Sequence, residues 1–102
     1  MKEYNKLVRD KIPEIISNNG EKPSIKVLND EEYKKELDKK ILEEVNEYLK
    51  DDNVEELADI AEVILAILAY KNVPIKAFEE IRNNKAKKRV AFNDRIFLEY
   101  TE

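Results

Sequence analysis

The chain has 102 residues, of which 41% are charged, and its formal net charge is −4. This length suits one domain spanning residues 1–102 and is too short for two. The sequence contains no cysteine and no histidine, which excludes disulfides, zinc–thiolate sites, His-ligated metal sites and Ser-His-Asp triads. Any catalysis must therefore use carboxylates, lysine, arginine, tyrosine, hard metal ions and water.

We expect a cytoplasmic protein that binds neither nucleic acid nor membranes. The mild negative charge argues against a generic nucleic-acid partner. The first residues lack the apolar core of a signal peptide. No apolar run reaches the roughly 18 residues that a membrane span requires.

The composition predicts an all-α fold, because there is one glycine and Glu and Lys are abundant. The first helix is expected within residues 7–18, with Asp10 as its N-cap. A long second helix should begin at Asn29 or Asp30, where Asn-Asp-Glu-Glu matches a capping box, and end near Lys50. Its apolar residues follow a helical stripe: Tyr33, Leu37, Ile41, Val45 and Tyr48.

Two further helices and a tail complete the predicted fold. After a short polar turn, a third helix is expected over residues 54–71 and a fourth from Pro74 to about Lys88. The alternating residues 95–100 are candidates for extended structure. Together with residues 25–28 they form a candidate short β element.

The third predicted helix is apolar on more than one face, since every residue from Ile60 to Tyr70 except Glu62 is apolar. The stripe expected to pack on the preceding helix comprises Leu57, Ile60, Ala61, Ile64 and Leu68. The apolar residues outside that stripe are Val63, Ala66 and Ile67. A short chain has few helices left to cover them, so we predict a homodimer or homotetramer built around this helix.

Acidic residues are mirrored about the turn between the second and third helices. Glu44 and Glu47 are three residues apart before the turn. Glu56 and Asp59 are three apart after it. Residues equally far from the turn of an antiparallel hairpin lie at the same height, so Glu47 should face Glu56. By the same rule, Glu44 should face Asp59, and the two layers should lie about 4.5 Å apart along the helices.

Four carboxylates this close repel one another unless a cation lies among them. Their hard oxygens suit Mg²⁺ or Mn²⁺. Compensating bases are scarce, with Lys50 the one base between Glu43 and Glu62. The alternative interpretation is a solvated acidic helix face. Basic residues at both ends of the chain could neutralise a metal-bound phosphate, although ordinary surface charge is the alternative there too.

The acidic motif resembles the EExxE…ExxD signature of the MazG-like all-α nucleotide pyrophosphohydrolases, as EEVNE at residues 43–47 and ELAD at residues 56–59. KLVRDKIPEII at residues 6–16 is similar to the N-terminus of the small house-cleaning branch of this superfamily. KRVAFNDRIFL at residues 88–98 is similar to its C-terminal segment, with Val-Ala in place of two glycines. Phosphoribosyl-ATP pyrophosphohydrolase belongs to the same superfamily.

The resemblance implies a four-helix MazG-like bundle in dimers or tetramers. It implies Mg²⁺-dependent cleavage between the α and β phosphates of a nucleoside triphosphate, in house-cleaning of non-canonical nucleotides. The metal ligands implied by the motif are Glu44, Glu47, Glu56 and Asp59. The catalytic role, activation of water beside the metal, is assigned to Glu44 and Glu47. The residues implied to bind phosphate are Lys85, Lys88, Arg89 and Arg95.

Two other functions stay open. One is phosphoribosyl-ATP hydrolysis in histidine biosynthesis. The other is a non-catalytic helical protein whose acids form a docking face for a partner. No motif specifies the base or the sugar of a nucleotide substrate.

Overall fold

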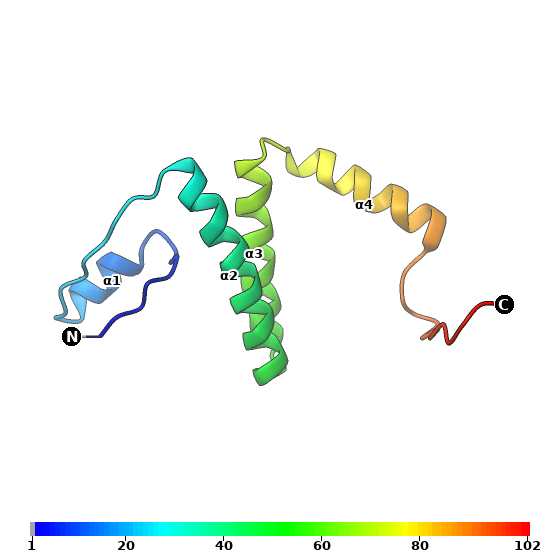
Figure 1. Ribbon diagram of the computed structural model, residues 1–102, viewed down its shortest axis with the longest axis horizontal. Helices are drawn as coiled ribbons and strands as arrows, with labels where there is room; N and C mark the ends of the chain where they lie inside the picture. The colour runs from blue at the N-terminus through cyan, green and yellow to red at the C-terminus, as the bar shows by residue number, and fades with distance from the viewer. Residues whose placement is uncertain (1) are drawn as a thin grey trace.

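The computed structural model describes residues 2–102, which form four α-helices joined by loops (Figure 1). The helices are α1 (Ile12–Asn18), α2 (Asp30–Asp51), α3 (Val54–Tyr70) and α4 (Ile75–Arg89). The described residues contain no strand, so the all-α prediction is confirmed and the candidate β element is wrong. Residues 25–28 and the C-terminal tail lie at opposite ends of the molecule in Figure 1. Neither segment therefore has the other as a pairing partner, and an isolated strand is not stable.

The first helix is shorter than predicted and is not capped by Asp10. α1 begins at Ile12, and its N-cap residue, Lys11, makes no side-chain capping bond. Pro13 lies in the first turn of α1, and its ring would clash with the carbonyl of Arg9 if the helix extended back to that residue. Residues 2–11 are consequently free to run as an irregular segment away from α1.

Four polar residues mark the ends of the two helices that form the α2–α3 hairpin. Asn29 and Glu32 form the predicted capping box: the Asn29 side chain accepts from the Glu32 N–H at 2.9 Å, and the Glu32 carboxylate accepts from the Asn29 N–H at 3.3 Å. At the other end of α2, Asp52 adopts a left-handed conformation with φ 50°. Asn53 then starts α3 by accepting from the Glu55 N–H at 2.9 Å. The two-residue turn makes α2 and α3 antiparallel neighbours (Figure 1).

The small core lies between α2 and α3. Leu37 of α2 is 1% exposed, and Val63 and Leu68 of α3 are each 8% exposed. The rings of Tyr33 and Tyr70 meet edge to face, with 6.0 Å between centroids, at the end of the hairpin away from its turn. This packing brings the acid-bearing parts of the two helices together near the turn.

The predicted packing face of α3 is wrong in part. Leu57 and Ala61 are exposed, whereas Val63 is buried and Ile67 is half-buried. A helix that is apolar nearly all round does not define one stripe, so its sequence leaves the packed face open. Val63 lies one turn after Asp59 on the same helix face, and that is the face turned toward α2.

The chain is far from compact. Its radius of gyration is 18.0 Å, against about 13 Å for a folded chain of this length. Its accessible surface is 9635 Å², against about 6000 Å² for a compact monomer of this mass. α4 leads away from the hairpin (Figure 1), and the tail after it is exposed, with Phe92 at 95% and Phe97 at 86%. Of the helices described, none is both long and apolar enough to cross a membrane.

Candidate metal centre

Five carboxylates from α2 and α3 form an acidic cluster near the hairpin turn. Oxygens of Glu44, Glu56 and Asp59 lie within 4.8 Å of one another. Oxygens of Glu47, Asp51 and Glu56 do the same, and Glu56 belongs to both groups. The structure thus brings together the four carboxylates that the mirrored spacing singled out. Asp51, the last residue of α2, is an additional member.

The size of the acidic cluster fits a small divalent cation. Two oxygens bound to one Mg²⁺ are separated by at most about 4.2 Å, since each Mg–O bond is about 2.1 Å. Separations within 4.8 Å can close to that value by small side-chain rotations. Glu44, Glu56 and Asp59 are half-buried, while Glu47 and Asp51 are exposed. The ion would therefore be held from the helix side and open to solvent on the other.

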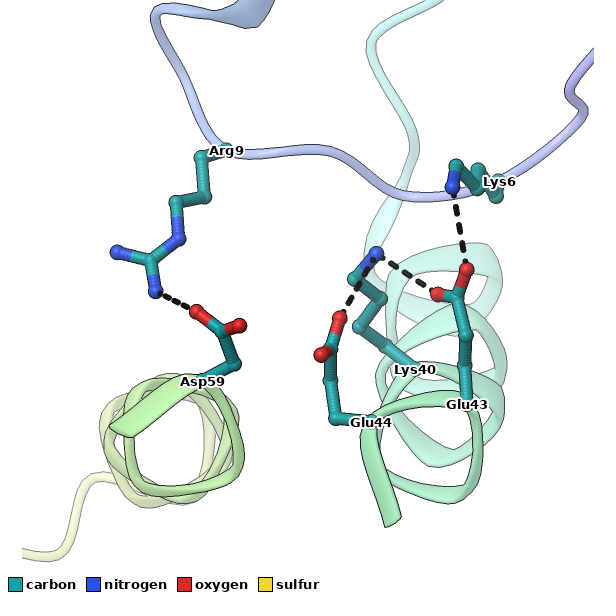
Figure 2. Close-up of polar contacts among 6 residues, drawn as sticks. All are labelled: Lys6, Arg9, Lys40, Glu43, Glu44 and Asp59. Carbon is teal, nitrogen blue, oxygen red and sulfur yellow. Dashed lines mark hydrogen bonds and ion pairs between the residues drawn. The ribbon is translucent and has the colours of Figure 1, made fainter. Parts of the chain in front are cut away.

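The N-terminal segment supplies cations to one end of the acidic cluster. Arg9 donates from Nη2 to Oδ1 of Asp59 at 2.7 Å. Lys6 donates from Nζ to Oε1 of Glu43, beside the cluster on α2, at 3.2 Å. Figure 2 shows this segment passing over both helices, with Arg9 directed at Asp59 and Lys6 directed at Glu43.

Lys40, a residue of α2, neutralises the same end of the acidic cluster as Arg9 and Lys6. Its Nζ lies 2.7 Å from Glu43 Oε2 and 3.4 Å from Glu44 Oε1. Burial alone would lower the Lys40 pKa, but the two carboxylates outweigh burial, and its pKa lies above the usual value. Burial alone would likewise raise the pKa of Glu43, but hydrogen bonds from Lys40 and Lys6 outweigh it, and that pKa is lowered.

The end of the acidic cluster nearer the hairpin turn has no basic residue paired with its carboxylates. Among residues 2–102, none of the ion pairs includes Glu47, Asp51 or Glu56. The pKa of Glu56 is raised, first by partial burial and then by the hydrogen bond and charge of Asp51 and the charges of Asp59 and Glu47. A cation bound at this end would relieve the charge repulsion among these carboxylates.

The C-terminal basic residues lie away from the acidic cluster. Lys85, Lys88 and Arg89 occupy the last turns of α4, and Arg95 is in the tail; all are exposed. α4 leaves the top of α3, whereas the acidic cluster lies near the opposite end of the hairpin (Figure 1). Within the described residues, no ion pair joins these bases to the cluster. Their assignment to phosphate binding stays a prediction.

The expected scarcity of bases holds for Glu47, Asp51 and Glu56 but is wrong for the other end of the acidic cluster. Lys40 lies just outside the acid-rich stretch, and its i,i+4 spacing to Glu44 was a signal that could have located it. Lys6 and Arg9 reach the acids through contacts between residues 37 and 50 positions apart. No spacing rule within a helix could have placed those two.

Comparisons with known proteins add one partial match. No family model matches the chain, and no solved structure matches it. An uncharacterised protein of Mycolicibacterium smegmatis is 54% identical over 41 residues. The match covers 40% of this chain and 42% of that protein, so the chain spans less than half of its relative's length.

Proposed function

We propose that this protein is a Mg²⁺-dependent nucleoside triphosphate pyrophosphohydrolase that cleaves between the α and β phosphates. The observation that carries the proposal is the acidic cluster. Its carboxylates, on two adjacent helices, are neutralised at one end and uncompensated at the other. Mg²⁺ is commonly held by a few carboxylates and by substrate phosphates, and the resemblance to MazG-like enzymes points to the same chemistry.

Different carboxylates of the acidic cluster would bind the metal ion and accept the proton in this reaction. Glu47, Asp51 and Glu56 would hold the ion at the uncompensated end, with Glu44 and Asp59 completing the set. A bound Mg²⁺ would neutralise phosphate charge and lower the pKa of a water molecule. Glu44 or Glu47 would accept the proton of the attacking water as its oxygen bonds to phosphorus. The bond to the bridging oxygen would then break, releasing nucleoside monophosphate and pyrophosphate.

We further propose that the active form is a homo-oligomer. The surface exceeds that of a compact monomer by more than half, and an exposed apolar row on α3 is available for contact: Leu57, Ala61 and Leu65. Exposed apolar rows of this kind mark interfaces. A neighbouring copy could also bring its Lys85, Lys88, Arg89 and Arg95 to the acidic cluster, which the same chain cannot do in this conformation.

Calorimetric titration with Mg²⁺ tests the metal site, and a nucleotide panel with pyrophosphate detection tests the activity. We expect millimolar or tighter Mg²⁺ binding and pyrophosphate release that stops in excess chelator. Phosphoribosyl-ATP belongs in the panel, because preferred turnover of that compound would select the alternative enzyme. A chain that binds no Mg²⁺ would be a docking protein, and the proposal would be wrong.

A further inference from the structure

We propose that Arg9, assisted by Lys6, binds the phosphate chain of the substrate over the acidic cluster. Asp59 would hold Arg9 in place until a divalent cation takes over that carboxylate. The inference rests on the proposed function and adds a phosphate-binding element outside the C-terminal residues assigned from the sequence.

The fold determines the position of Arg9 through Pro13 and two ion pairs. Pro13 prevents α1 from extending backwards, which leaves the preceding residues to cross the hairpin. The segment is anchored on α2 through Lys6 and Glu43, and on α3 through Arg9 and Asp59. In Figure 2 it lies over the space between the two helices, on the side to which Asp59 and Glu44 point. A phosphate bound to a cation in the cluster would therefore meet this segment.

The Arg9 guanidinium has hydrogen-bond donors that are not used by Asp59. A guanidinium carries five N–H donors, and within residues 2–102 the Arg9 side chain uses one of them, from Nη2 to Oδ1 of Asp59. Its side chain is 58% exposed. The remaining donors can therefore reach solvent, and their fork geometry matches phosphate oxygens bidentately. Lys6, 44% exposed, adds a positive charge on the α2 side.

The contact with Asp59 also makes Arg9 a competitor of the cation. Its positive charge lies at hydrogen-bond distance from a carboxylate that we assign to the metal, so it opposes binding of Mg²⁺ alone. Exposed ion pairs of this kind are weak, and Arg9 can exchange Asp59 for phosphate at little cost. Loss of Arg9 should therefore have opposite effects on the two ligands: Mg²⁺ alone should bind as well or better, and phosphate should bind worse.

Calorimetry on the full chain tests this with two probes, Mg²⁺ alone and inorganic pyrophosphate in saturating Mg²⁺. The variant is Arg9→Ala, and the matched control is Arg82→Ala. Arg82 is likewise exposed and paired with a carboxylate, Glu79, at 2.8 Å, but on α4 away from the cluster. Circular dichroism establishes that each variant is folded, and Arg9→Lys replaces Arg9→Ala if the latter is not.

We expect Arg9→Ala to bind pyrophosphate about tenfold or more weakly, as for the loss of hydrogen bonds to a charged group, and to bind Mg²⁺ with equal or higher affinity. Arg9→Lys should be intermediate for pyrophosphate, because it keeps the charge and loses the fork. Arg82→Ala should match the wild type with both probes.

Wild-type pyrophosphate affinity in Arg9→Ala would overturn the inference and leave the proposed function standing on its Mg²⁺ binding. Parallel loss of both ligands in folded Arg9→Ala would show a structural role and overturn it as well. Absence of Mg²⁺ binding in the wild type would overturn the proposed function and this inference together.

Discussion

The α2–α3 hairpin and the segments outside it differ in how far the chain covers its own surface. The hairpin contains all three residues that are buried among those described, Leu37, Val63 and Leu68, and it holds the acidic cluster. α4 and the C-terminal tail contain no buried residue, and most of their residues are exposed. The candidate metal centre is thus built locally by one hairpin, whereas the C-terminal bases lie outside the hairpin and are exposed.

The largest expected effect is at Glu56, which belongs to both groups of the acidic cluster. Glu56→Gln should reduce turnover at least about 100-fold, because even indirect supports of metal ligands are worth 10- to 100-fold. It should not lower the melting temperature without metal, since the substitution removes repulsion. Steady-state kinetics and thermal melts measure both, with Glu79→Gln on α4 as the control. Activity retained in Glu56→Gln would remove Glu56 from the site.

Leu65 tests whether the exposed face of α3 is an interface. It is 40% exposed, and Leu65→Lys would place a charge in the proposed contact. We expect the oligomer to dissociate to a chain of 12.0 kDa and to lose most of its activity. Light scattering at low micromolar concentration measures the mass, and Lys35→Glu on an exposed position of α2 is the control. A wild-type protein that is monomeric and active would contradict the oligomer.

Arg89 tests whether a neighbouring copy completes the site. Glu56→Gln and Arg89→Ala should each be impaired alone. If the bases act between copies, unfolding and refolding an equal mixture should restore about a quarter of the intact sites in a two-fold dimer. The assay is the rate of pyrophosphate release before and after mixing. No recovery in the mixture, with both variants folded and oligomeric, would place Arg89 outside the neighbour's site.

The smallest effect concerns the start of α2. A hydrogen bond from Lys26 and the capping bond from the Asn29 backbone lower the pKa of Glu32. A lowered folded-state pKa contributes stability above the usual carboxyl range, and that contribution is lost as pH falls through the folded pKa. Glu32→Gln should therefore lose stability relative to wild type at neutral pH, and the difference should shrink as pH falls below about 4.5. Urea unfolding at a series of pH values measures it, and a pH-independent difference would refute the coupling.

The features predicted correctly from the sequence are local ones. The capping box of Asn29 and Glu32 and the short polar turn before α3 are each determined by a few consecutive residues. Once that turn is known, the facing of Glu47 and Glu56 follows from helix geometry alone. This is why the sequence sufficed to bring the candidate metal ligands together.

The features missed depend on distant contacts or on a choice among equal faces. Arg9 and Asp59 are 50 residues apart, and nothing in a helical repeat links them. The packed face of α3 could not be read from its own residues because nearly all are apolar, and contact with α2 decides between Val63 and Ala61. The start of α1 differs by one residue from that of a helix capped by Asp10, because Lys11 takes the N-cap position.

The most direct test of the proposed function is ³¹P NMR of a nucleoside triphosphate incubated with the wild-type protein in Mg²⁺. A parallel sample contains Glu56→Gln, and a third contains excess chelator. We predict nucleoside monophosphate and pyrophosphate as the products of the wild-type sample, with negligible conversion in the other two. Nucleoside diphosphate and inorganic phosphate as products, or equal conversion with Glu56→Gln, would contradict cleavage between the α and β phosphates at the acidic cluster.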